Sequence, residues 1–197
     1  ATLMHDDVVD ESNERRGRQT ANLVFGNQAS VLVGDFLFSK SFQMMVKSGS
    51  LEILPILSDA STIIAQGEVL QLTTTNDIKT NLSAYMQVIE SKTAALFSAS
   101  CEVGAVLSDR SAEERTAMRL YGTKLGTAFQ IIDDALDYAA DQETLGKEIG
   151  DDFKEGKMTA PVIYALQEAN EEETFFWERT LSKNLQEESD FDQAMAY

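Results

Sequence analysis

Apolar residues recur at helical spacing along most of the chain, and the alternation that is typical of strands is nearly absent. The pattern predicts long helices over residues 28–47, 51–72, 81–107 and 112–139, and shorter helices around residues 160–169, 172–183 and 190–196. The first four residues read as a helix already under way, whereas residues 141–157 form a loop rich in glycine and charge. We therefore expect an all-α bundle of long helices.

Local sequence signals add detail to the predictions for three of these helices. The apolar face of residues 28–47 is so broad that we expect this helix to be largely buried. Pro55 is tolerable because it lies in the first turns of its helix, and Ser111 and Glu114 form a capping box that fixes the start of the fourth. Since no repeat and no convincing linker interrupts the pattern, residues 1–197 are predicted to form a single domain.

Composition excludes several classes of function. The chain carries 33 acidic residues against 16 Lys and Arg, a formal net charge of −17, whereas nucleic acids and anionic membranes attract basic patches. The single cysteine, Cys101, excludes an intramolecular disulfide framework, and the single histidine, His5, excludes His-rich zinc sites. No apolar run approaches the roughly 18 residues that span a bilayer, so we expect a cytoplasmic protein.

Two acidic motifs share the spacing Asp-Asp-x-x-Asp. They consist of Asp6, Asp7 and Asp10, and of Asp133, Asp134 and Asp137. On a helix, residues three and four apart share a face, so each motif points at least two carboxylates in one direction. In so acidic a chain, either motif alone is also compatible with a solvated surface.

The surroundings of the second motif favour a metal site. Apolar residues lie on both sides of Asp133 and Asp134 in the sequence, namely Phe129, Ile131, Ile132, Leu136 and Tyr138. Carboxylates among apolar residues need a cation, because burying an unpaired carboxylate has a high free-energy cost. Oxygen ligands favour Mg²⁺ or Ca²⁺, and Mg²⁺ shares such sites with substrate phosphates. The two motifs therefore suggest two walls of one cavity with metal ions between them.

Basic residues are scarce, yet several follow an acidic motif or interrupt an apolar helix. These are Arg15, Arg16, Lys92, Lys147 and Lys157. Singly, each is explained as well by surface charge, but together they supply the cations that a diphosphate site requires. The chain has no Walker-type glycine loop, so phosphates would not be held as they are in nucleotide kinases.

The order of these motifs resembles that of the trans-prenyltransferases, the polyprenyl diphosphate synthases. The resemblance covers residues 1–170 and rests on MHDDVVDES, RRG, GD at 34–35, GEVLQL at 67–72, ESKTAALF at 90–97, FQIIDDALDY at 129–138 and GKEIGDDFKEGKMTAP at 146–161. It implies the isoprenoid-synthase fold, an all-α helical bundle around a central cavity.

The resemblance also implies a role for each candidate residue. The metal ligands would be the six aspartates of the two motifs, which would bind Mg²⁺ around an allylic diphosphate. That diphosphate would be held by Arg15, Lys92, Lys147 and Lys157. Arg16 would contact isopentenyl diphosphate, and Thr93 and Gln130 would lie near the carbon that ionises.

The implied reaction condenses isopentenyl diphosphate with an allylic diphosphate and needs no nucleophilic side chain. In the family, bulky residues four and five positions before the first motif shorten the product. Here these positions are the small Thr2 and Ala1, which predicts a medium- to long-chain polyprenyl diphosphate of the kind used for quinone side chains. The resemblance further implies a homodimer, with residues 28–47 as a contributor, and a product that passes to a membrane.

Departures from the family pattern leave alternatives open. The upstream Gly-Lys-x-x-Arg motif and a further His, which bind isopentenyl diphosphate in the family, do not occur, so we expect the chain to lack N-terminal helices and part of the C-terminal end. The alternatives are a class I terpene cyclase and a non-catalytic partner subunit of a heteromeric synthase. Phe175, Phe176 and Trp177 are expected to be packing residues rather than a ligand site.

Overall fold

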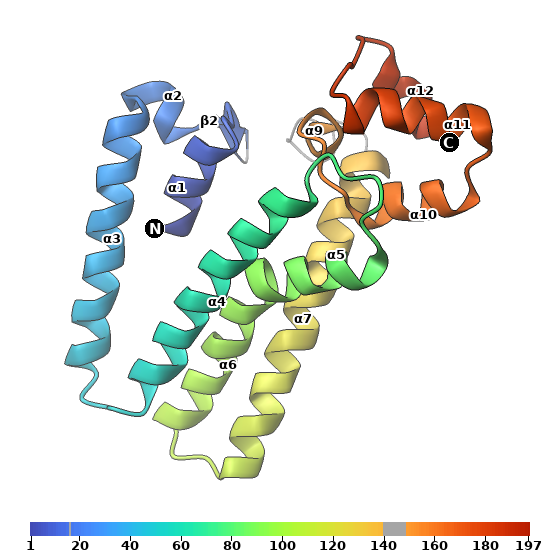
Figure 1. The fold of residues 1–197 in the computed structure, drawn as a ribbon. Helices are drawn as coiled ribbons and strands as arrows, with labels where there is room; N and C mark the ends of the chain where they lie inside the picture. Colours follow the sequence, from blue (N-terminus) through green and yellow to red (C-terminus); the bar gives the residue numbers. More distant parts are fainter. Residues whose placement is uncertain (16, 140–148) are drawn as a thin grey trace. The chain divides into compact units, whose positions relative to one another are not determined.

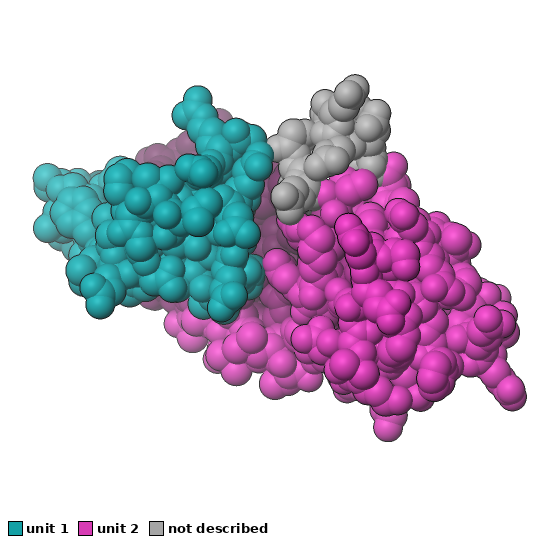
Figure 2. Space-filling model, turned by 90° about the horizontal axis from the view of Figure 1, so that it is seen from above, with its two compact units in different colours: residues 1–54, 141–148 teal, residues 55–140, 149–197 magenta. Residues whose placement is uncertain are grey.

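The computed structural model describes residues 1–15, 17–139 and 149–197 and consists mainly of α-helices (Figure 1). Its described residues form two compact units, which Figure 2 colours separately. Unit 1 comprises residues 1–54, and unit 2 comprises residues 55–139 and 149–197. The all-α class is confirmed, whereas a single domain over residues 1–197 stays a prediction.

Unit 1 is a helical hairpin with a short connecting ribbon. Its elements are α1 (Thr2–Val9), β1 (Glu14–Arg15), β2 (Arg18–Gln19), α2 (Ala21–Phe25) and α3 (Asn27–Lys47). The two strands are antiparallel and pair Glu14 with Gln19, a feature that the helical periodicity did not predict. Gly17 has a φ of +71°, a conformation that glycine adopts without steric cost at such a turn.

The prediction that residues 28–47 are largely buried is wrong. The buried residues of α3 are Ser30, Gly34 and Met45, whereas its large apolar side chains include Phe36 and Met44, which are 64% and 67% exposed. Periodicity reports how wide the apolar face of a helix is, but it does not report what covers that face. Within unit 1, α1 and α2 cover only a narrow stripe of α3.

Long helices form the first part of unit 2, close to their predicted ranges. They are α4 (Ile53–Thr74), α5 (Leu82–Ile89), the π-helical turn η1 (Glu90–Ala94), α6 (Ala95–Leu107) and α7 (Ala112–Ala139). The predicted capping box is present, since the Ser111 amide donates to Glu114 at 2.9 Å and the Glu114 amide donates to Ser111 Oγ at 3.2 Å. Within the described part of the chain, α4 is the one helix long and apolar enough to cross a membrane, a property that core helices of soluble proteins share.

Two glycines bring α7 unusually close to its neighbours. A Cβ at Gly122 would lie 2.5 Å from the Phe97 carbonyl oxygen, and one at Gly126 would lie 2.6 Å from Ala94 Cα. Both contacts are too short for any side chain, so α7 packs with its backbone against η1 and α6, and Figure 1 shows α6 and α7 side by side. The second acidic motif follows on the same helix.

Shorter helices and an aromatic core complete unit 2. The elements are α9 (Asp151–Lys154), α10 (Ala160–Glu168), α11 (Glu171–Trp177), the π-helical turn η2 (Glu178–Ser182) and α12 (Asp190–Ala196). The turn α9 lies in a stretch that was predicted to be loop. Phe176 and Trp177 are core residues, in agreement with their predicted role in packing, whereas Phe175 is 62% exposed.

Arg179 and the buried Asp190 form a bidentate ion pair at this end of unit 2, with N–O distances of 2.8 and 2.7 Å. These hydrogen bonds from Arg179 lower the pKa of Asp190, so the pair stabilises the fold above the ordinary Asp pKa and less as the pH falls through the lowered one. We expect the Asp190→Asn variant to be less stable than the wild type at pH 7 and to approach it below about pH 4. Denaturant titrations at both pH values test this, and an equal difference at both would contradict it.

Candidate metal and diphosphate site

The first acidic motif lies on α1 in unit 1, beside Arg15. The Arg15 side chain donates to Asp7 Oδ1 from Nε at 2.8 Å and from Nη2 at 2.7 Å, and Nη2 lies 3.8 Å from Asp6. Asp7 is buried, whereas Asp6 and Asp10 are half-buried. The hairpin β1–β2 carries Arg15 back over α1, so the structure brings together an arginine and two acids that the sequence predicted as one site.

The residues next to this motif fix α1 on α3. The His5 ring nitrogen Nε2 lies 3.1 Å from the Val31 carbonyl oxygen and 3.3 Å from Asp35. A Cβ at Gly34 would lie 2.3 Å from that same nitrogen, so only glycine leaves room for the imidazole. The Gly34–Asp35 pair, which the sequence singled out without a role, therefore seats the histidine that precedes Asp6.

The second motif lies on α7 in unit 2, and its middle aspartate is enclosed by donors. Asp134 is 4% exposed. Its Oδ2 accepts a hydrogen bond from the Tyr85 hydroxyl at 2.6 Å, and its Oδ1 accepts one from the Gln130 amide at 2.7 Å. Gln130 in turn accepts a hydrogen bond from the Thr93 hydroxyl at 2.8 Å. Tyr85, on α5, was missed by sequence reasoning because nothing in its local pattern distinguishes it from a core tyrosine.

Burial raises the pKa of Asp134, and the hydrogen bonds from Tyr85 and Gln130 oppose this rise. Burial likewise raises the pKa of Tyr85, which the bond to Asp134 raises further, so the tyrosine stays protonated as the donor. The partners of Asp134 in this structure are therefore protein donors. Of the apolar residues near Asp134 in the sequence, Phe129 and Ile132 are 55% and 59% exposed, whereas Ile131 and Tyr138 pack against the core of unit 2.

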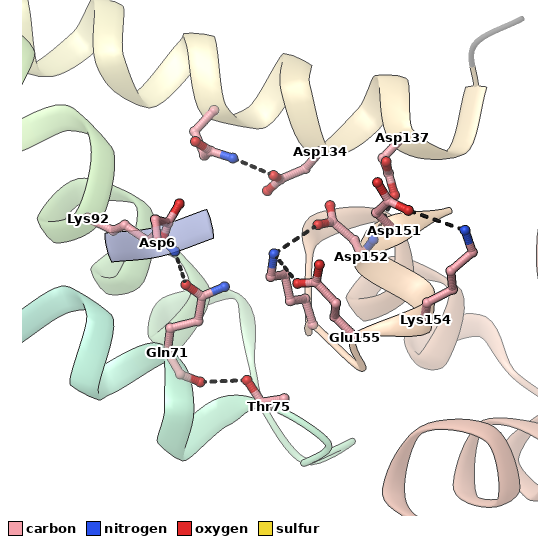
Figure 3. Close-up of polar contacts among 12 residues, drawn as sticks. Asp6, Gln71, Thr75, Lys92, Asp134, Asp137, Asp151, Asp152, Lys154 and Glu155 are labelled. Atoms are coloured by element: carbon pink, nitrogen blue, oxygen red, sulfur yellow. Dashed lines mark hydrogen bonds and ion pairs between the residues drawn. The ribbon is translucent and has the colours of Figure 1, made fainter. Parts of the chain in front are cut away.

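The end of the second motif is tied to the turn α9. Asp137 is buried, and its Oδ2 accepts a hydrogen bond from the Asp152 backbone amide at 3.0 Å. Lys157 lies 3.7 Å from Asp152 and forms an ion pair with Glu155. Both of these acidic partners are labelled in Figure 3. The charge of Lys157 also lowers the pKa of Asp134. The turn thus brings a predicted diphosphate-binding lysine to the second motif.

Lys92 and Thr93 are adjacent in the π-helical turn η1. Lys92 Nζ donates a hydrogen bond to Gln71 Oε1 at 2.7 Å (Figure 3). It also lies 2.8 Å from Glu68 Oε2. Both partners lie on α4 and belong to GEVLQL, a segment shared with the family pattern for which the sequence predicted no role. π-Helical turns inside α-helices are rare and frequently occur at functional sites.

Unit 2 thus holds most of the predicted site residues, namely Lys92, Thr93, Gln130, Asp133, Asp134, Asp137 and Lys157, and unit 1 holds Asp6, Asp7, Asp10 and Arg15. Arg16 and Lys147 lie outside the described residues. In the described ranges, no three His, Cys, Asp or Glu side chains form a group that could hold a metal by themselves. The candidate metal-ligand atoms in both motifs are carboxylate oxygens. They suit Mg²⁺, which binds few protein carboxylates and completes its coordination shell with water and phosphate.

Comparisons with known proteins agree on one family. The polyprenyl synthetase family model matches residues 1–197. The chain is 53% identical over 173 residues to the octaprenyl diphosphate synthase of Escherichia coli, covering 88% of this chain and 54% of the relative. It is 46% identical over 182 residues to an all-trans-nonaprenyl-diphosphate synthase of Rhodobacter capsulatus, covering 92% and 56%. The chain therefore spans about half the length of these relatives.

Solved structures share the fold. A decaprenyl diphosphate synthase from Rhodobacter capsulatus matches with a TM-score of 0.92 and 51% identity, over 99% of this chain and 60% of that one. A polyprenyl synthase from Caulobacter crescentus, complexed with calcium and isoprenyl diphosphate, matches with a TM-score of 0.95 and 48% identity, over 98% and 59%. These likenesses confirm the predicted isoprenoid-synthase helical fold.

Proposed function

Because this chain belongs to the polyprenyl synthetase family, we propose that the protein containing it condenses isopentenyl diphosphate with an allylic diphosphate to give a medium- to long-chain polyprenyl diphosphate. The observation that carries the proposal is the environment of the second motif. Asp134 shares one network with Thr93 and Gln130. Asp137 accepts a hydrogen bond from the amide of Asp152, whose side chain pairs with Lys157. The identity to octaprenyl and nonaprenyl diphosphate synthases supports the long-chain type.

The reaction begins with heterolysis of the allylic C–O bond, which leaves pyrophosphate and an allylic cation. The double bond of isopentenyl diphosphate then attacks this cation, and the proton lost from the adduct passes to pyrophosphate. Lys92 and Lys157 would hold the leaving diphosphate, and Thr93 and Gln130 would face the ionising carbon. Carboxylates of the two motifs would hold Mg²⁺, which supplies positive charge to the leaving group when it is bound.

Further proposals concern assembly and location. We infer a homodimer, supported by the exposed apolar side chains of α3, which would be costly to leave in water on a monomer. We also infer that the protein is cytoplasmic, which the lone Cys101 supports because such thiols are usual in a reducing compartment. The long hydrocarbon product would pass from there to a membrane.

Pyrophosphate release separates the proposed function from its alternatives. The full-length protein is incubated with Mg²⁺ and farnesyl diphosphate, with and without isopentenyl diphosphate. A synthase forms an elongated product only when both substrates are present. A terpene cyclase releases pyrophosphate from farnesyl diphosphate alone and yields a cyclic hydrocarbon, and a non-catalytic subunit releases none. Either of the last two results would overturn the proposal.

The Ala1→Phe variant of the full-length protein is expected to give shorter products than the wild type. The reason is steric, because a bulky ring five positions before Asp6 would block the path of the growing chain. Separation of the products by chain length measures the change. An unchanged distribution would show that this position does not limit the chain.

A further inference from the structure

The segment GEVLQL of α4 has no role in the reaction proposed above, yet it packs closely against the turn η1. Gly67 is buried, and a Cβ at this position would lie 2.6 Å from the Lys92 backbone nitrogen and 2.9 Å from Ser91 Cβ. Neither distance is possible for a real side chain. The backbones of α4 and η1 therefore touch at Gly67, which fixes the distance between the two elements.

Close to this contact, two side chains of α4 contact the Lys92 ammonium through acceptor oxygens. Glu68 and Gln71 are three residues apart and so share a face of α4. Glu68 Oε2 lies 2.8 Å from Lys92 Nζ, and Gln71 Oε1 accepts its hydrogen bond at 2.7 Å. The Lys92 side chain is only 20% exposed. Its charged end is thus held by side chains and not by solvent alone.

On its other side, η1 is anchored to α7. The hydroxyl of Thr93 donates to Gln130, which belongs to the network around Asp134. Two consecutive residues of one turn are therefore bound to two different helices. Such an arrangement determines the direction of both side chains before any substrate arrives, and preorganised groups of this kind contribute most to electrostatic catalysis.

We propose that Glu68 and Gln71 are positioning residues, which orient the Lys92 ammonium toward the allylic diphosphate. An ammonium has three donors on a flexible stem, and two acceptors on a rigid helix restrict its direction. The proposal rests on the proposed function, because it assumes that Lys92 binds the diphosphate of the allylic substrate.

The test is a double-mutant cycle in the full-length protein, with the KM for farnesyl diphosphate and for isopentenyl diphosphate measured separately. Gln71→Leu removes the acceptor at nearly constant size and is expected to raise the KM for farnesyl diphosphate about tenfold, the scale of lost outer-shell support. The KM for isopentenyl diphosphate is expected to stay unchanged. Gln71→Glu keeps an acceptor oxygen and should restore the KM, and Gln66→Leu, at an exposed position of α4, is the matched control.

The cycle is completed with Lys92→Ala. If Gln71 acts through Lys92, the Gln71→Leu change has no further effect on the KM in the Lys92→Ala background. An equal effect in both backgrounds, or none in either, overturns the inference. If Lys92→Ala itself leaves the KM for farnesyl diphosphate unchanged while elongation persists, the assigned role of Lys92 and this inference both fail, but the synthase function stands. Should Gln71→Leu not fold, Glu68→Leu enters the same cycle.

Discussion

The Asp133→Asn variant of the full-length protein is expected to lose at least about 10²-fold in kcat, the effect of removing one preorganised electrostatic group. Asp133 is the half-buried neighbour of Asp134, whose two carboxylate oxygens accept hydrogen bonds from Tyr85 and Gln130. Asp133 belongs to the second motif, whose carboxylates we propose to bind Mg²⁺. The variant keeps the size of the side chain and removes the charge that Mg²⁺ requires.

Steady-state rates at increasing Mg²⁺ concentration measure this effect. Asp6→Asn in the first motif is expected to behave in the same way, because both motifs would bind metal. Asp59→Asn is the control, since Asp59 is an exposed acid on α4. A normal kcat with an unchanged requirement for Mg²⁺ in either motif variant would remove that residue from the metal site.

The second large effect is expected in stability. Phe153 on α9 is 2% exposed and packs against Phe176, Trp177 and Phe191, with ring centroids 6.5, 6.2 and 5.9 Å away. Its carbonyl oxygen also accepts a hydrogen bond from the Gln186 side chain at 2.8 Å. The Phe153→Ala variant is expected to lower the free energy of unfolding by about 3–5 kcal/mol, as large core truncations do.

Truncation of Phe153 is also expected to disturb the second acidic motif. Phe153 directly follows Asp152, whose backbone amide donates a hydrogen bond to Asp137. Denaturant unfolding of the full-length protein measures the stability change. Phe175→Ala is the matched control, since this ring is 62% exposed, and it should cost below about 1 kcal/mol. Similar losses in the two variants would mean that the aromatic cluster does not hold α9.

Hydrophobic periodicity predicted most helices of this chain but not their environment. The ranges of α3, α4 and α7 agree with the sequence pattern, and the capping box at Ser111 fixes where α7 begins. The two-residue strands were missed because they are too short for any alternation to appear. The exposure of α3 was missed because its cover depends on packing, which a one-dimensional pattern does not contain.

The same distinction between local pattern and packing applies to the residues of the candidate site. Residues that act through a local motif, such as Asp133 and Lys92, could be found in the sequence. Tyr85 could not, since it lies 49 residues from Asp134 in the chain and meets it only because their two helices pack together. Gln71 belongs to the recognisable segment GEVLQL, but its contact with Lys92 depends on the close approach of α4 at Gly67.

The structure shows how the buried acids of the two motifs are compensated. Of the chain's 33 acidic residues, six belong to the two motifs, and three of these six are buried, namely Asp7, Asp134 and Asp137. Each is compensated differently: Asp7 by the Arg15 guanidinium, Asp134 by a phenol and an amide, and Asp137 by a backbone amide. The basic residues beside these acids include Arg15 and Lys157, which we propose to hold a diphosphate.

Mass analysis of the product formed by the full-length protein from farnesyl and isopentenyl diphosphates in the presence of Mg²⁺ tests the central claim most directly. We predict a polyprenyl diphosphate that is several isoprene units longer than the starter and that does not form when a chelator removes Mg²⁺. Unreacted substrates, or a product extended by a single unit, would contradict the assignment of this chain to medium- and long-chain elongation.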